Sequence, residues 1–69
     1  MTYQELKNLT DGKQLPIAGK NEDGENVIVS HGKIGDRKYY KLTTAQSNGW
    51  TRYNYVYEDG DTEESYAKG

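Results

Sequence analysis

The chain of 69 residues contains no cysteine and only one histidine, His31. Without cysteine it can form neither a disulfide bond nor a thiolate–metal centre, and one imidazole cannot supply the usual ligand set of zinc. Nucleophilic catalysis needs a nucleophile and a positioned base, but Ser30, the neighbour of His31, would point to the opposite side of a strand. We therefore expect a non-enzymatic protein that holds no metal and no cofactor.

Long apolar segments are also absent. No stretch approaches the roughly 20 apolar residues that a membrane-spanning helix needs. The first nine residues, MTYQELKNL, contain neither a basic leader nor an apolar run of signal-peptide length. We therefore expect no membrane association and a cytoplasmic location.

Aliphatic residues are scarce as well. The chain has no phenylalanine, and its valine, isoleucine and leucine residues together number only ten. A chain of this length forms one domain, here residues 1–69, and buries only about 60% of the surface that its unfolded state exposes. Some of the seven tyrosines must therefore fill core volume, with their hydroxyl groups kept at the edge of the core.

A short helix is predicted near the N-terminus. Apolar residues recur there at helical spacing, at Tyr3, Leu6 and Leu9. Thr2 is a suitable N-cap and Glu5 follows it by three residues, which is the capping-box pattern. A helix this short is marginal in water by itself, so we expect it to dock on the rest of the domain.

Turn signals at intervals of roughly 10–13 residues divide the remaining chain into β-strands. The predicted strands cover residues 14–18, 25–30, 37–44, 50–57 and 62–66. Pro16 makes the first of these an edge strand or an extended lead-in, because proline cannot donate to a strand ladder. The segment from His31 to Asp36, which contains Gly32 and Gly35, is predicted to form a turn.

The predicted fold class is mainly β: a small five-stranded antiparallel sheet with a short N-terminal helix. If the sheet curls, the domain would look like an SH3-like or OB-like barrel. If it stays open, the helix would pack on one face in an α+β arrangement. The segment Asn26–Val29 is apolar on both faces, which favours a central strand covered on one side.

Residues 50–57, WTRYNYVY, form the most aromatic segment of the chain. Side chains of a strand alternate between its two faces, so Tyr53, Tyr55 and Tyr57 share one face while Trp50 and Arg52 share the other. If the tyrosine side is buried, Trp50 and Arg52 are exposed together. If it is not buried, the three tyrosines form an open stripe.

Charge is distributed unevenly, although the net charge is only −2. Residues 36–52 contain four basic residues and one acidic residue, a balance of +3, whereas residues 53–69 contain five acidic residues and one basic residue, a balance of −4. The opposite charges of the two segments can pair across neighbouring strands. Alternatively, the division marks two functional surfaces.

The first of two binding hypotheses is a protein-interaction module. An exposed aromatic and polar sheet face would bind another protein, because tyrosine, tryptophan and arginine are enriched at interaction hot spots. The candidate binding residues are Arg37, Tyr39, Lys41, Trp50, Arg52, Tyr53 and Tyr55. The acidic segment 58–64 would suit a basic partner, even as a mimic of a nucleic-acid backbone.

The alternative is a single-stranded nucleic-acid-binding β-domain. Bases would stack on Tyr39 and Trp50, while the basic residues of segment 37–52 follow the phosphates: Arg37, Lys38, Lys41 and Arg52. An isoelectric point near 5.2 opposes this hypothesis. A homo-oligomer formed by edge-strand pairing is a further possibility, because only charges protect the last strand. Small, turn-rich acidic chains of this kind are common among bacterial and phage proteins, but no motif here carries a family resemblance.

Overall fold

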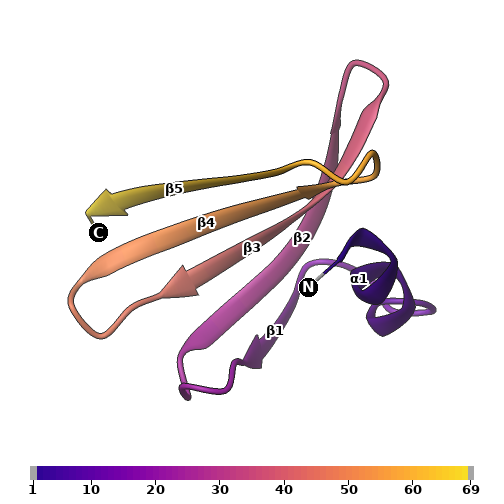
Figure 1. Ribbon diagram of the computed structural model, residues 1–69. Helices are drawn as coiled ribbons and strands as arrows, with labels where there is room; N and C mark the ends of the chain where they lie inside the picture. The colour runs from indigo at the N-terminus through magenta and orange to yellow at the C-terminus, as the bar shows by residue number, and fades with distance from the viewer. Residues whose placement is uncertain (1, 69) are drawn as a thin grey trace.

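A computed structural model of the protein describes residues 2–68. One helix and five strands form its regular structure: α1 (Tyr3–Leu9), β1 (Ile17–Lys20), β2 (Asn26–Ile34), β3 (Arg37–Ala45), β4 (Trp50–Tyr57) and β5 (Thr62–Lys68). The strands lie in sequence order in one antiparallel sheet (Figure 1). This confirms the predicted fold class. The sheet does not close, so the open-sheet arrangement is the one adopted and no barrel forms.

The helix begins with the predicted capping box. The Thr2 hydroxyl oxygen accepts a hydrogen bond from the Glu5 backbone N–H, and the Glu5 carboxylate accepts one from the Thr2 N–H, both at 3.2 Å. The second of these bonds is the main reason why the pKa of Glu5 lies below its ordinary value. The capping box satisfies two backbone donors that a helix otherwise leaves without partners.

The helix packs on one face of the sheet, beside β1, β2 and β3 (Figure 1). Its Leu6 side chain is completely buried. The core combines one helix residue with four strand residues: Leu6, Val27, Val29, Tyr40 and Val56. Within residues 2–68, no helix or strand covers the opposite face of the sheet (Figure 1).

The C-terminal end of the helix is also tied to the sheet. Thr10 is the C-cap residue and is buried. Its hydroxyl donates a hydrogen bond of 2.8 Å to the Leu6 carbonyl oxygen and lies 3.3 Å from the Tyr40 hydroxyl oxygen. Because Tyr40 is on β3, this contact holds the docked helix against the middle of the sheet.

The predicted turn over residues 31–36 is wrong. Strand β2 continues to Ile34, with Gly32 opposite Tyr39 and Lys33 opposite Lys38, and the chain turns only at residues 35–36. Gly35 has a φ of 59°, the positive value that a two-residue hairpin turn favours. Gly32 is therefore a strand residue. Two other strands shift less: β1 starts after Pro16 and ends at Lys20, and β5 extends to Lys68.

No helix among the described residues is both long enough and apolar enough to cross a membrane.

Candidate functional site: the tyrosine face

The strand register gathers most of the candidate residues on the uncovered face of the sheet. On β3 and β4, Tyr39 lies opposite Tyr57, and Lys41 lies opposite Tyr55. Side chains of these residues point away from the core, because their neighbours Tyr40 and Val56 are core residues. We call this surface the tyrosine face and define it by Arg37, Tyr39, Lys41, Tyr53, Tyr55 and Tyr57.

The other two candidates lie on the helix side of the sheet. Trp50 and Arg52 have the same parity in β4 as the core residue Val56, so they share its face. Trp50 is 41% exposed, and it lies opposite Lys68 of β5. The seven candidate residues therefore do not form one surface: five belong to the tyrosine face and two belong to the opposite face.

The tyrosine rings pack edge to face across β3 and β4. The centre of the Tyr39 ring lies 5.5 Å from that of Tyr55 and 5.8 Å from that of Tyr57, with interplanar angles of 65° and 60°. Aromatic pairs prefer this arrangement, which contributes about 0.5–1.5 kcal/mol beyond the area buried. Tyr57 is only 3% exposed on an otherwise open face. Neighbouring side chains of the same face bury it, so the side chains of the tyrosine face pack against one another.

Tyr57 is also held at its hydroxyl group. The hydroxyl donates a hydrogen bond of 3.2 Å to the Glu63 carboxylate on β5. Burial, followed by this bond to Glu63, raises the pKa of Tyr57 above its ordinary value of 10.0. Tyr57 is thus held both by ring packing against Tyr39 and by the hydrogen bond of its hydroxyl group. Through Glu63, β5 also contributes to the tyrosine face.

Two cations lie over these rings. The guanidinium carbon of Arg37 is 3.9 Å from the centre of the Tyr57 ring. The ammonium nitrogen of Lys41 is 4.8 Å from the Tyr53 ring centre and 5.6 Å from that of Tyr55. Distances below about 6 Å allow attraction between the charge and the ring quadrupole. The two cations therefore add order to the face.

Arg37 forms ion pairs with two carboxylates of the β4–β5 turn. Its Nε lies 3.1 Å from Asp59 Oδ2, and one of its terminal nitrogens lies 3.1 Å from Asp61 Oδ2. The hydrogen bond to Asp59 is the main cause that raises the pKa of Arg37. The pKa of Asp59 is lowered, first by a bond from the Asp61 backbone N–H and then by Arg37. Opposite charges of the basic and acidic segments thus meet at this turn.

Lys41 differs from Arg37 in this respect. The ion pairs within residues 2–68 involve Arg37 and Arg52, and none involves Lys41. Its direct neighbours across the sheet are Ser30 and Tyr55, which carry no charge at neutral pH. Lys41 therefore presents a positive charge on an aromatic surface without a carboxylate beside it.

Residues of β2 enlarge the tyrosine face in a way that sequence analysis did not predict. Ile28 is 47% exposed and Ile34 is 59% exposed, and both have the parity of the uncovered face. The sequence placed Ile28 in a strand that is apolar on both sides and Ile34 in a turn. Residues 30–33, SHGK, contain no apolar side chain, so no alternation of apolar and polar residues marks the continuation of the strand to Ile34.

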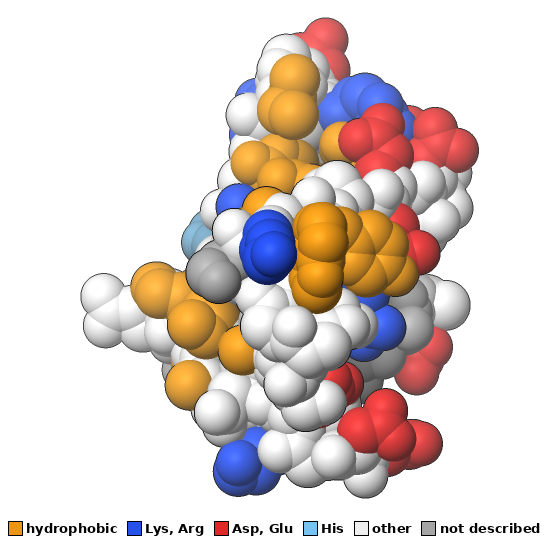
Figure 2. Space-filling model, turned by 90° about the vertical axis from the view of Figure 1, so that its left-hand side faces the viewer, with side chains coloured by type: hydrophobic (Ala, Val, Ile, Leu, Met, Phe, Trp, Pro, Cys, Tyr) orange, Lys and Arg blue, Asp and Glu red, His pale blue; other side chains and the backbone are white. Residues whose placement is uncertain are grey.

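The space-filling view shows hydrophobic and basic side chains next to one another. In Figure 2, orange hydrophobic groups run from the top of the molecule to its middle with blue basic groups beside them, while red acidic groups collect along the right-hand side. On this side of the molecule, acidic side chains are therefore largely separated from the hydrophobic groups.

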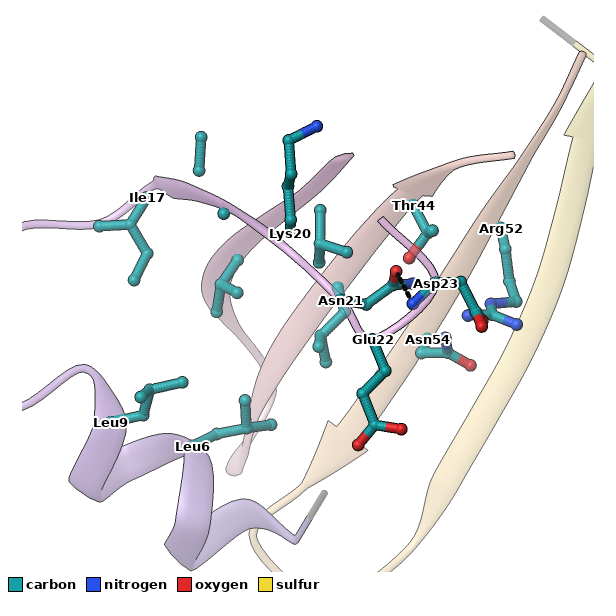
Figure 3. A pocket seen from close by; sticks show the side chains of 15 residues that line it. Leu6, Leu9, Ile17, Lys20, Asn21, Glu22, Asp23, Thr44, Arg52 and Asn54 are labelled. Carbon is teal, nitrogen blue, oxygen red and sulfur yellow. Dashed lines mark hydrogen bonds between the residues drawn. The ribbon is translucent and has the colours of Figure 1, made fainter. Parts of the chain in front are cut away.

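A groove lies on the opposite side of the sheet (Figure 3). It has a volume of about 570 Å³ and lies between α1, the β1–β2 loop and the middle of the sheet. Arg52 and Asn54 line one end, and Arg52 Nε is buried there without a hydrogen bond, 4.0 Å from Glu64. Much of the apolar lining, such as Leu6 and Val29, belongs to the core itself. The groove is thus the open margin of a small core.

Within residues 2–68, no three His, Cys, Asp or Glu side chains come close enough together to hold a metal ion. Comparisons with protein-family models, with curated proteins and with solved structures find no match. The tyrosine face is therefore the candidate functional site.

Proposed function

We propose that this protein is a non-enzymatic interaction module, which binds a protein partner through the tyrosine face. The supporting observation is a sheet face that no other element of residues 2–68 covers and that displays Tyr39, Tyr53 and Tyr55, each partly exposed. Tyrosine supplies a large and rigid contact area with few rotatable bonds, and it is common at interaction hot spots.

The order of the face supports binding. Ordering a flexible side chain at an interface costs about 0.5–1.5 kcal/mol. Tyr39 and Tyr55 already pack against each other, and Lys41 already lies over Tyr55, so these groups lose less freedom when a partner binds. The exposed Ile28 and Ile34 add apolar area at the margin.

The charge of the face indicates the partner's chemistry. Lys41 carries the positive charge that no carboxylate of the described residues neutralises, and it stands among aromatic rings. A partner with an acidic side chain inside an apolar patch could form a charge-assisted hydrogen bond with Lys41. The apolar contacts around this bond would exclude water from it. The proposed partner is therefore a protein whose matching surface is apolar and weakly acidic.

Single-stranded nucleic acid receives less support. Its two predicted stacking residues, Tyr39 and Trp50, lie on opposite faces of the sheet. Arg37 is already paired with two aspartates. One strand of nucleic acid on the tyrosine face would meet aromatic rings and Lys41, but not a continuous row of free cations, which phosphate binding needs.

The test compares matched variants as baits in partner capture. Tyr55→Ser removes a ring of the tyrosine face, and Trp50→Ser removes an exposed ring of the same strand from the other face. We expect Tyr55→Ser to lose a protein that the original chain and Trp50→Ser both retain. Circular dichroism checks that both variants fold. Equal retention by the two variants would contradict the proposal.

A charge reversal gives an independent comparison. Lys41→Glu and Lys38→Glu make the same change of charge in β3, but on opposite faces. Only Lys41→Glu should weaken capture. The nucleic-acid alternative is tested by the fluorescence anisotropy of a labelled single-stranded oligonucleotide at low and moderate salt. Tight binding that weakens steeply as salt rises would favour that alternative, because it reports the release of counterions.

A further inference from the structure

Strand β5 offers a long edge for pairing with another chain, and only its charged side chains protect it. All seven residues of Thr62–Lys68 are exposed, and within residues 2–68 no strand pairs with their outer side. The pairing of β5 with β4 runs without a bulge from Thr62 to Lys68. The strand contains no proline. Proline, bulges, short length and charged side chains are the features that normally protect an edge, and of these β5 has only the charges.

The other edge of the sheet is different. Strand β1 has only four residues and follows directly after Pro16. Its exposed ladder is therefore short, and its start is blocked by a residue that cannot donate a hydrogen bond. Edge pairing is thus expected at β5.

The backbone groups available at the β5 edge follow from the ladder. The Tyr57 N–H donates to the Asp61 carbonyl at 2.8 Å, so the carbonyl group of residue 61 points toward β4. In an antiparallel ladder this direction alternates along the strand. The residues that point their N–H and C=O groups outward are therefore Thr62, Glu64, Tyr66 and Lys68.

We propose that a second copy of this chain pairs with β5 in antiparallel orientation, in a register centred on Tyr66. In this register, Glu64 of each copy lies directly opposite Lys68 of the other, and the two Tyr66 side chains meet at the two-fold axis. Opposite charges and aromatic pairs stabilise directly opposed positions of a sheet. Tyr66 is 54% exposed and therefore accessible for this contact.

The alternative two-fold registers are less complementary. A register centred on Glu63 or on Glu64 places like charges directly opposite each other, which is destabilising. A register centred on Ser65 pairs Glu64 with Tyr66 and Lys68 with Thr62, so it forms no ion pair. The Tyr66 register opposes unlike charges twice, and it uses the outward backbone groups of Glu64, Tyr66 and Lys68.

The dimer would join two five-stranded sheets into one continuous sheet of ten strands. Its two-fold axis is perpendicular to the sheet, so the two tyrosine faces lie on the same side. The two copies would then present a pair of equal binding surfaces, which raises apparent affinity for a repeated target. The dimer itself does not depend on the function proposed above, because it uses a different surface.

Sedimentation velocity over a range of concentrations tests the proposal. We expect a monomer–dimer equilibrium that Glu64→Lys and Lys68→Glu each weaken by about tenfold or more, because each change opposes like charges twice. The double variant, which exchanges the two charges, should return to within a few-fold of the original chain. Glu22→Lys changes the net charge equally in the β1–β2 loop and should leave the equilibrium unchanged.

A backbone variant keeps the test independent of these charges. The Tyr66 N–H points outward, so Tyr66→Pro removes a donor of the edge without breaking a hydrogen bond to β4. Circular dichroism should show that this variant folds, and sedimentation velocity should show that it stays monomeric. A chain that is monomeric at about 1 mM, or a double variant that does not recover dimerisation, would overturn the proposal.

Discussion

The ring of Tyr39 lies across the backbone of Gly32, its direct neighbour on β2. A Cβ atom at Gly32 would be only 2.6 Å from Cζ of the ring, a distance that real Cβ contacts do not show. Gly32 is not among the glycines with a positive φ, so this position requires space and no special backbone conformation. Gly32 therefore lies beneath the Tyr39 ring of the tyrosine face and leaves room for it.

The first prediction follows from this contact. Gly32→Ala should displace the Tyr39 ring and disturb its packing with Tyr55 and Tyr57, lower the free energy of unfolding by about 1–3 kcal/mol and weaken partner binding. Gly19→Ala is the matched control, since nothing lies within 4 Å of a Cβ at that strand position. Urea denaturation and the NMR shifts of the tyrosine rings measure the two effects. Equal behaviour of the two variants would show that the ring does not need Gly32.

A second prediction concerns the docking of the helix. Leu6→Ala removes the completely buried side chain of α1 and should cost about 2–5 kcal/mol, which is a large part of the stability of so small a domain. Leu9→Ala makes the same change at a side chain that is 47% exposed and should cost far less. Thermal denaturation followed by circular dichroism compares the two. A similar loss in both variants would mean that the helix is held by its caps rather than by Leu6.

Acid should destabilise the fold in part through Asp59. The pKa of this carboxyl is lower in the fold than its ordinary value of 3.8, so its ionised form stabilises the fold above that value. The contribution is lost as the pH falls through the folded-state pKa. Asp59→Asn should therefore make the denaturation midpoint fall less between about pH 5 and pH 2. The effect should be small, because the Arg37 and Asp59 side chains are 42% and 54% exposed. If the denaturation midpoint of Asp59→Asn fell as much with pH as that of the original chain, Asp59 would not contribute to the loss of stability in acid.

Alkali should act through Tyr57. Its pKa is raised in the fold, so the neutral phenol stabilises the folded state, and this stabilisation is lost as the pH rises toward and through the raised value. Tyr57→Phe keeps the ring but removes the ionisable group, so it should reduce the loss of stability at high pH. Thermal denaturation across the alkaline range measures this loss. A variant as sensitive to alkali as the original chain would argue against the buried position of the Tyr57 hydroxyl.

The elements that sequence analysis predicted correctly are defined by local signals. The capping box at Thr2 and Glu5 sets the start of α1, and the Asn48–Gly49 turn sets the start of β4. Both bounds depend on residues within a few positions of each other in the sequence. The end of β2 depends on a distant residue, because Gly32 stays in the strand opposite Tyr39 of β3. A glycine that makes room for a ring looks, in sequence, like a glycine in a turn.

The exposed side of β4 could not be predicted from its own residues. The pattern of residues 50–57 allows either face to be buried, and the choice depends on which face α1 covers. Leu6 and Val56 belong to the same core, so Tyr53 and Tyr55 lie on the open side, and Trp50 lies apart from them. The sequence therefore identified the aromatic strand but grouped residues from its two faces into one candidate site.

The most direct test of the tyrosine face is site-specific photocrosslinking in cells. A photoreactive phenylalanine analogue replaces Tyr53 in one variant and Trp50 in another, so that each probe stands on one face of β4. We predict that the probe at position 53 forms a covalent adduct with another protein and that Lys41→Glu reduces its yield, while the probe at position 50 does not form this adduct. An adduct that forms only from position 50, or none from position 53, would contradict the assignment of the tyrosine face as the binding surface.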